Sequence, residues 1–310
     1  MKKSDTDGYF KSEMCHCLAC GSEEIRAWLV KSKGSMQFNL WKCNDCYTGF
    51  MNPQPKREYL DAIYHKSGHG LIEPISSEEV IRLETEYPNA TVDGERLVGK
   101  AKSFLAGKND LKALDIGSGF GFFSKAAALA GFEVMAVNPG KWENEVFEKI
   151  NGFSPLPYFF DEVDFKKEKF DLIILSQVLE HIEEPLAFLQ KIKSLLSPSG
   201  IIAIAVPNVD SILVKLLKAK DNGCLWVPEH LTYFSAKGLA TLLSRAGFAV
   251  KSHMYISRIP YNALSRRLNL AGAPRRIMNG LVKNLQKPPL QLMNWLGLGL
   301  THNIWGQVAT

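Results

Sequence analysis

The sequence predicts an α/β fold, in which a doubly wound, mostly parallel β-sheet follows a small cysteine-rich domain. Short, nearly continuous apolar runs alternate with segments of helical periodicity, as in a parallel sheet that is buried on both faces. A glycine-rich turn at residues 117–121 follows the first of these runs, where doubly wound sheets bind ligands. Five of the six cysteines lie within the first 46 residues, which indicates a separate N-terminal unit.

Length and composition favour a folded protein without a membrane span. The chain has 310 residues and is 46% hydrophobic, which is enough for a sizeable core. Its apolar runs fall short of the roughly 18 residues that a membrane-spanning helix needs. The N-terminal stretch MKKSDTDGYFKSE has no apolar signal-peptide core. We therefore expect a cytoplasmic protein.

The N-terminal cysteines form two Cys-x-x-Cys pairs, Cys17 with Cys20 and Cys43 with Cys46, with 22 residues between the pairs. Four thiolates at this spacing can close a tetrahedral zinc site, and such a closed site is structural rather than catalytic. About fifty residues with little core of their own need a clip of this kind to fold. We predict a zinc ribbon over residues 1–50, with Cys15 as a spare cysteine that could replace a ligand.

Residues 51–94 are expected to connect the ribbon to the sheet. MNPQP is extended, a helix is predicted over REYLDAIYHK, and residues 66–90 are interpreted as loop and short helix. Apolar residues at helical spacing between residues 92 and 105 then lead into the glycine turn.

The sheet domain is predicted over residues 95–259. Strands are expected at 112–117, 133–137, 156–159, 170–176 and 200–208, with helices at 122–130, 141–151, 185–196 and 236–246. Two late strands, near 249–257 and at 303–309, complete a seven-stranded sheet. Residues 260–302 then form an excursion from the sheet, and residues 303–310 supply its last strand.

The charge is uneven along the chain. The net charge is +5, yet no acidic residue follows Glu229, whereas ten lysines and arginines do. A segment of one sign attracts anions such as a phosphate-bearing substrate, nucleic acid or an acidic membrane surface. A solvated basic surface without a partner is the alternative.

The glycine turn favours one of two cofactors. A dinucleotide site has the spacing G-x-G-x-x-G, but this chain reads G-x-G-x-G and has Phe122 at the third position. This spacing disfavours NAD, and S-adenosylmethionine is the competing interpretation.

Five ordered stretches carry a family resemblance: LDIGSGFGFF, AVNPG, FDLIILSQVLEHIEEP, LLSPSGIIAIAVPN and EHLTYFSAKGLATLLSRAGF. Over residues 95–255 the chain resembles the class I S-adenosylmethionine-dependent methyltransferases, which implies a Rossmann-like sheet. The cysteine-rich start followed by NPQP is similar to a bacterial subset found with polysaccharide and sugar-modifying genes.

The resemblance implies which residues contact the cofactor. Asn138 stands where the family has an acidic residue that binds the ribose hydroxyls, so a charge-assisted hydrogen bond is lost. Asp164 and Phe165 resemble the adenine-contacting pair. The implied cofactor-binding residues are Asp115, Gly117, Ser118, Gly119, Gly121, Asn138, Asp164, Phe165, Ser176, Gln177 and Val178.

Two histidines are candidate catalytic bases. A hydroxyl acceptor must lose its proton, and a positioned base accelerates such a step by typically 10²–10⁴-fold. His181 and His230 are the candidates, and Glu180 and Glu229 could orient them or bind polar substrate. The alternative is that these histidines pack and orient their loops. Tyr233 is interpreted as a packing residue.

Several acceptors are disfavoured by the sequence. SQVL replaces the Asn- or Asp-Pro-Pro-aromatic motif of amino-methylating nucleic-acid enzymes, and the Pro-Cys dipeptide of cytosine-C5 enzymes does not occur. We expect a sugar, glycan precursor or other small-molecule acceptor that bears phosphate, and do not expect nucleic acid. RNA methylation, a non-catalytic binding module and an NAD-linked sugar oxidoreductase are the alternatives.

The basic excursion at 260–302 carries Ile277, Leu281, Val282 and Leu285 at helical spacing. Such a segment could cap the active site, or lie at the inner face of the membrane, against an anionic surface that holds a lipid-linked glycan. Packing against the sheet with exposed charges is the alternative.

Overall fold

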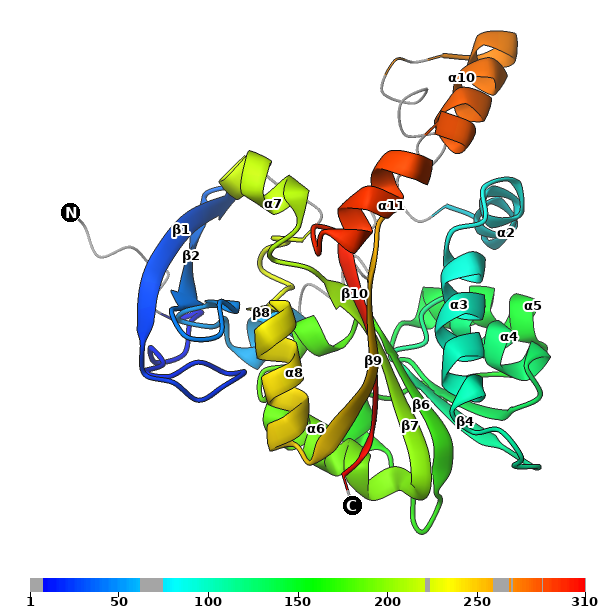
Figure 1. Ribbon diagram of the computed structural model, residues 1–310, viewed down its shortest axis with the longest axis horizontal. Helices are drawn as coiled ribbons and strands as arrows, with labels where there is room; N and C mark the ends of the chain where they lie inside the picture. Colours follow the sequence, from blue (N-terminus) through cyan, green and yellow to red (C-terminus); the bar gives the residue numbers. More distant parts are fainter. Residues whose placement is uncertain are drawn as a thin grey trace.

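The computed structural model describes residues 8–61, 75–220, 224–258, 268, 270–285 and 287–309. These residues form two sheets, one of four strands and one of six strands, with helices around the larger sheet (Figure 1). The predicted α/β class with a mostly parallel sheet is confirmed.

The larger sheet has the strand order β5-β4-β6-β7-β10-β9. Strands β5, β4, β6 and β7 are parallel, whereas β10 runs antiparallel to both of its neighbours. Its strands are β4 (Lys112–Ile116), β5 (Glu133–Val137), β6 (Phe170–Ser176), β7 (Leu196–Pro207), β9 (Phe248–Ile256) and β10 (Thr301–Val308). The last strand therefore returns from far along the chain and inserts between β7 and β9.

The described part of this sheet has six strands rather than the predicted seven. The stretch expected to form a strand at 156–159 makes only a single parallel bridge, between Leu156 and Val137. Pro155 and Pro157 flank Leu156 and have no N–H to donate, so the ladder cannot extend. The chain turns instead into the short 3₁₀ helix η1 (Phe160–Glu162).

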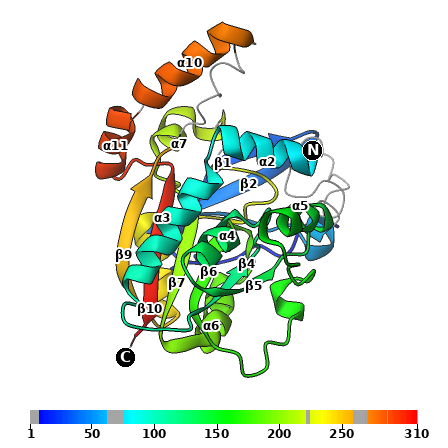
Figure 2. The ribbon, with the colours of Figure 1, turned by 90° about the vertical axis from the view of Figure 1, so that its right-hand side faces the viewer.

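Helices cover both faces of the sheet. One face bears α3 (Ala90–Ser103), α4 (Phe122–Leu129) and α5 (Lys141–Asn151), and the other bears α6 (Pro185–Leu195) and α8 (Ala236–Arg245) (Figures 1 and 2). Strand β6 shows the alternation: Leu172 and Ile174 belong to the core beneath α3 and α4, whereas Ile173 and Leu175 belong to the core beneath α6 and α8.

The smaller sheet has the order β1-β2-β3-β8. Its strands are β1 (Ile25–Lys33), β2 (Met36–Cys43), β3 (Gly49–Met51) and β8 (Thr232–Tyr233). Strand β8 joins it from the middle of the second half of the chain. The N-terminal cysteine region and the segment that carries His230 are thus held together by strand pairing between Gly49 and Tyr233 and between Phe50 and Thr232.

The remaining helices lie at the periphery. Helix α2 (Ser77–Glu86) precedes α3, and α7 (Ile212–Leu217) leads into the 3₁₀ helix η3 (Lys218–Lys220). Helices α10 (Gly272–Leu285) and α11 (Lys287–Trp295) project from the body of the molecule (Figures 1 and 2). Of the helix predicted over residues 57–66, residues 57–61 are helical and the rest lies outside the described residues. Among the described helices, none combines the length and the apolar character that crossing a bilayer requires.

Candidate active site

The glycine turn after β4 is closed by the backbone of the neighbouring strand. Both Gly117 N–H and Ser118 N–H donate to the carbonyl of Val137, at 2.8 and 3.2 Å. Gly117 has a φ of 66° and Gly121 a φ of 85°, a region that side chains disfavour. A Cβ on Gly117 would also lie 2.6 Å from the Val178 Cγ2 atom. The sequence requires glycine here for both backbone conformation and space.

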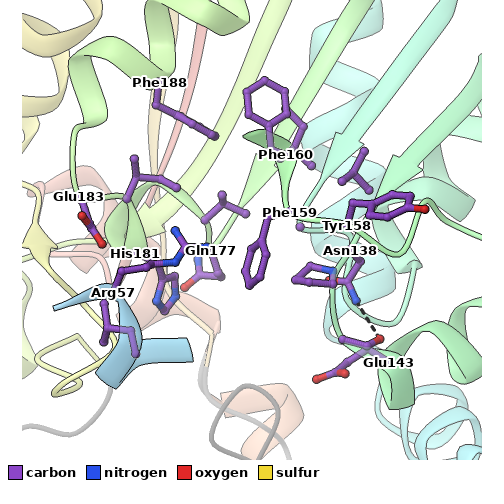
Figure 3. A pocket seen from close by; sticks show the side chains of 18 residues that line it. Arg57, Asn138, Glu143, Tyr158, Phe159, Phe160, Gln177, His181, Glu183 and Phe188 are labelled. Carbon is purple, nitrogen blue, oxygen red and sulfur yellow. Dashed lines mark hydrogen bonds between the residues drawn. The ribbon is translucent and has the colours of Figure 1, made fainter. Parts of the chain in front are cut away.

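Two cavities flank this turn. The first extends over Asn138, Pro139 and Gly140 to the aromatic residues 158–160 (Figure 3). The second extends over Gly119 and Ser176 towards Trp226, Glu229 and His230. Both are lined by Gly117, Gln177 and His181. A ligand in the first cavity would therefore meet a ligand in the second beside these three residues.

Most of the residues expected to contact the cofactor line these cavities. Gly117, Asn138, Gln177 and Val178 line the first. Asp115, Gly117, Ser118, Gly119, Gly121, Ser176 and Gln177 line the second. Their position follows from topology, because the carboxyl ends of β4, β5 and β6 meet at one edge of the sheet.

Asp115 is a buried acid at the end of β4. Only 1% of the residue is exposed, and its carboxylate accepts a hydrogen bond from the Ser124 hydroxyl at 2.6 Å. Burial raises the pKa of Asp115 to about 7, although the bond from Ser124 opposes this shift. The acid therefore links the end of β4 to α4, whose first turn carries Ser124.

Asn138 is completely buried, and its side chain is engaged within the protein. Its Oδ1 accepts a hydrogen bond from the Gly119 N–H at 3.2 Å. Its Nδ2 donates to Asn144 Oδ1 at 2.8 Å and to the Gly140 carbonyl at 3.3 Å (Figure 3, dashed line to Gly140). Asn138 thus ties the glycine turn to the start of α5.

Asp164 and Phe165, expected at the adenine, lie outside both cavities. Phe165 packs in the core, with its ring 5.5 Å from that of Phe160 and 6.2 Å from that of Phe170. Asp164 is exposed and accepts a hydrogen bond from the Lys166 N–H. The proline-flanked Leu156 ends the strand early, and residues 158–160 line the first cavity where this pair was expected.

Other residues at the cavities were missed by sequence reasoning. Tyr158, Phe159 and Phe160 form an aromatic run, which could have been noticed as a candidate adenine-binding surface. Arg57, whose guanidinium lies 4.5 Å from the Phe159 ring centre, comes from the connector and gave no signal. Glu143 lines the first cavity from the first turn of α5.

His181 and His230 come together although 48 residues separate them in the chain. Their ring centres are 4.8 Å apart at an interplanar angle of 82°. His181 Nδ1 lies 2.8 Å from the Glu229 carbonyl, and His230 Nδ1 lies 2.8 Å from the Cys224 carbonyl. A carbonyl only accepts hydrogen bonds, so each Nδ1 carries a proton and each Nε2 is the basic nitrogen of the neutral ring.

The two glutamates beside these histidines differ. Glu180 is 1% exposed, its carboxylate oxygens have no hydrogen-bond partner among the described residues, and burial raises its pKa to about 8. Glu229 accepts a hydrogen bond from Lys33 Nζ at 2.7 Å. Ligand atoms of Glu180, His181 and His230 lie within 4.8 Å of one another, a set that could hold a divalent cation.

The four predicted zinc ligands form one cluster. Ligand atoms of Cys17, Cys20, Cys43 and Cys46 lie within 4.8 Å of one another. The Cys17–Cys46 and Cys20–Cys43 sulfur pairs are each 3.6 Å apart. Tetrahedral zinc with Zn–S bonds of about 2.3 Å requires sulfurs about 3.8 Å apart, so the cluster fits this ion.

Each cysteine pair forms a tight turn. Gly21 N–H donates to the Cys17 carbonyl and Tyr47 N–H to the Cys43 carbonyl, and both of these residues have positive φ, at 80° and 64°. The hydrogen bond from the Cys17 thiol lowers the pKa of Cys46 to about 5. Cys15 is exposed and lies outside the cluster.

Residues 92–253, more than half of the chain, match the family model described as methyltransferase domain. The chain belongs to this family, that of the S-adenosylmethionine-dependent methyltransferases, and the predicted resemblance is confirmed at this level.

Individual relatives align with only part of this chain. The ubiquinone biosynthesis O-methyltransferase of Actinobacillus pleuropneumoniae serotype 5b is 35% identical over 108 residues, 31% of this chain and 46% of the relative. That of Parvibaculum lavamentivorans is 25% identical over 178 residues, 52% of this chain and 67% of the relative. The first of these alignments therefore spans about half of the curated relative. A solved S-adenosylmethionine-dependent methyltransferase from Mesorhizobium loti has a TM-score of 0.45 at 15% identity, covering 67% of this chain and 96% of the other.

Proposed function

We propose that the protein transfers a methyl group from S-adenosylmethionine to a hydroxyl oxygen of a sugar, a glycan precursor or a similar small molecule. The observation that carries this proposal is the His181–His230 pair beside the junction of the two cavities. The ubiquinone enzymes named above are O-methyltransferases by their names, which supports oxygen as the acceptor atom.

The two cavities suit two substrates held side by side. The first, with Tyr158 and Phe159, would take the adenosine of the cofactor, and the glycine turn would approach its methionine part. When bound, S-adenosylmethionine supplies an electrophilic methyl group. The acceptor would occupy the second cavity, and alignment of its oxygen with that methyl group accounts for much of the acceleration.

The histidine pair would remove the acceptor's proton. The carbonyls of Glu229 and Cys224 orient the two rings and leave Nε2 as the basic nitrogen. A neutral imidazole is suited to accept a proton near neutral pH. Glu180, buried close to both rings, has a pKa raised to about 8, so it would stabilise the imidazolium as a counter-charge in its ionised form, which mildly alkaline pH favours.

The walls of the second cavity support a polar acceptor. Trp226 offers an amphipathic face, and Glu229 and His230 offer hydrogen-bonding groups. Lys33 contacts Glu229 and lies 5.8 Å from the Trp226 ring centre, with its side chain half exposed. Lys33 does not itself line the cavity, but by neutralising the Glu229 carboxylate it removes a charge that would repel a phosphate on the acceptor.

We further propose that the cysteine cluster binds a structural zinc ion and that residues 1–50 supply a zinc ribbon. The donor set supports this, because four thiolates at 3.6 Å spacing suit tetrahedral zinc. The cluster packs against buried Phe50 and Leu18 and lies outside both cavities. The ion would hold the ribbon together rather than take part in the reaction.

A peripheral contact with an anionic membrane is proposed for α10. Ile277, Leu281 and Leu285 recur every four residues and are 65%, 48% and 69% exposed. Arg276 is exposed on the same helix, and an apolar stripe with basic residues suits an anionic bilayer surface. Arg266 and Arg267 lie outside the described residues. Flotation with phosphatidylglycerol vesicles should carry the protein, and the Ile277→Glu and Leu281→Glu double variant should remain unbound.

Calorimetric titration with S-adenosylmethionine and with NAD tests the cofactor. We expect binding of the first alone. Transfer of labelled methyl groups to a sugar phosphate monoester, to the same sugar after phosphatase treatment, and to RNA then tests the acceptor. Labelling of the phosphorylated sugar above the other two is expected. Equal labelling of the dephosphorylated sugar would contradict the phosphate requirement, and labelling of RNA alone would overturn the acceptor class.

A further inference from the structure

The cofactor cavity lacks the acidic group expected at residue 138. Asn138 is neutral, and its side-chain oxygen and nitrogen already bond to Gly119, Asn144 and Gly140. With 0% exposure, this amide is committed to holding the glycine turn. A different side chain must therefore meet the two hydroxyls of a bound ribose.

Glu143 provides a carboxylate at the same place. It is the third residue of α5, only 4% exposed, and it lines the first cavity with Asn138, Pro139 and Gly140. Figure 3 shows its side chain beside that of Asn138, with the carboxylate next to the cavity. Among the described residues, none forms a hydrogen bond or ion pair with this carboxylate. A buried acid without a protein donor is costly unless a ligand supplies one.

Neighbouring residues hold this carboxylate in position. A Cβ at Gly140 would overlap the Glu143 carboxylate, so glycine at this position leaves the space that the carboxylate occupies. Asn144 Nδ2 donates to the Asn138 carbonyl at 2.9 Å and so ties the first turn of α5 to the end of β5. The N-terminal end of a helix also favours a negative charge.

We propose that Glu143 is the ribose-binding residue of this protein, accepting hydrogen bonds from the cofactor's 2′- and 3′-hydroxyls. The inference rests on the proposed function, because it requires that S-adenosylmethionine binds in the first cavity. In this assignment the acidic residue lies in the first turn of α5 rather than at the end of β5, and the Asn138 amide holds the glycine turn in place.

Titration of the wild-type protein and of Glu143→Gln with S-adenosylhomocysteine and its 2′-deoxy analogue tests this inference. We expect Glu143→Gln to weaken S-adenosylhomocysteine binding at least tenfold, because hydrogen bonds to charged groups are the stronger ones. The wild-type protein should bind the 2′-deoxy analogue less tightly by a similar factor. The variant should discriminate much less between the two ligands, because the group that reads the hydroxyl is gone.

Glu145→Gln is the matched control, since Glu145 is exposed on the same helix and should leave both affinities unchanged. Thermal melting of each variant reports whether α5 remains folded. Equal discrimination by the wild-type protein and Glu143→Gln would overturn the assignment to Glu143. No binding of either ligand to the wild-type protein would instead overturn the proposed function.

Discussion

Asn138 shows how a side chain at the wall of a cavity can hold the surrounding backbone in place. Its amide joins the glycine turn, the end of β5 and the start of α5, all within one buried cluster. At the residue scale, the cofactor site therefore depends on side chains that hold backbone in place as much as on those that line the cavity.

Replacing Asn138 by alanine should loosen this cluster. We expect the free energy of unfolding to fall by about 1–3 kcal/mol, because buried partners are left unsatisfied, and cofactor affinity to fall with it. Urea denaturation and calorimetry measure the two effects. Asn109→Ala, at an exposed position, should change neither. Unchanged stability of Asn138→Ala would contradict the role assigned here.

Gly117 should tolerate no side chain. Alanine at this position meets both an unfavourable φ and the Val178 methyl group, so we expect cofactor affinity to fall more than tenfold. Gly107→Ala is the control, because Gly107 has a φ of 85° but lies outside both cavities, and it should leave cofactor affinity unchanged. If Gly117→Ala binds cofactor as the wild type does, the glycine turn is not the binding site.

Asp115 should make stability depend on pH. Burial raises its folded-state pKa from 3.8 to about 7, so the folded protein holds a proton that the unfolded chain releases. Its stabilising contribution is complete below pH 3.8 and is lost as pH rises through 7. Between pH 3.8 and pH 7 the free energy of unfolding should fall by up to about 1.4 kcal/mol per pH unit.

Urea denaturation between pH 5 and pH 8 measures this slope. Asp115→Asn should remove this contribution of Asp115 to the pH dependence of the free energy of unfolding. Asp110→Asn, at an exposed position, should keep the pH dependence of the wild type. An identical slope in the wild-type protein and Asp115→Asn would show that Asp115 titrates normally.

At the scale of elements, short pieces of backbone place the histidines. His181 ends the 3₁₀ helix η2 (Leu179–His181), and His230 directly precedes the segment that pairs with β3. Leu231 connects the His181 segment to β3. Its N–H donates to the Glu180 carbonyl, and its carbonyl accepts a hydrogen bond from the Met51 N–H. The histidine pair thus depends on an interaction between the two sheets.

Replacing either histidine by asparagine should lower the methyl-transfer rate by about 10²–10⁴-fold if the pair supplies the general base. Cofactor affinity should change little by comparison, since His181 touches the first cavity only at its edge with the second. Single-turnover rates at saturating cofactor measure this effect. Full activity of both variants would show that the two histidines only pack and orient their loops, which is the alternative that the sequence leaves open.

At the scale of the whole molecule, the small sheet supports the segment that lines the second cavity with Trp226, Glu229 and His230. Ser235 bonds to the Cys46 carbonyl, Arg245 Nη1 donates to the Ala19 carbonyl at 2.9 Å, and Lys33 of β1 bonds to Glu229. These contacts connect the cysteine cluster to the segment that carries His230. A change at the cluster should therefore reach the second cavity.

Removing the proposed zinc ion should lower the methyl-transfer rate more than cofactor affinity. The glycine turn follows β4, which belongs to the larger sheet. His230, in contrast, lies next to β8, which pairs with β3 of the small sheet. We expect Cys43→Ser, or treatment with a zinc chelator, to lower the methyl-transfer rate strongly and cofactor affinity weakly. Metal analysis should find one zinc per chain in the wild-type protein and in Cys15→Ser. Full activity of metal-free protein would contradict this coupling.

The sequence by itself determined the features that depend on local pattern. The apolar runs, the glycine turn and the paired cysteines each encode their geometry within a few residues. Apart from the stretch at 156–159, the strands, the turn and the cysteine cluster lie where these patterns predict them. Periodicity and turn chemistry are local physics.

Only the tertiary structure decided what long-range contacts control. Phe165 packs against Phe160 and Phe170 in the core, whereas Tyr158 lines the first cavity. The burial of Asn138, the place of Glu143 and the pairing of β8 with β3 depend on how distant segments pack. No local pattern encodes such contacts, because their energy comes from partners that meet only in the folded chain.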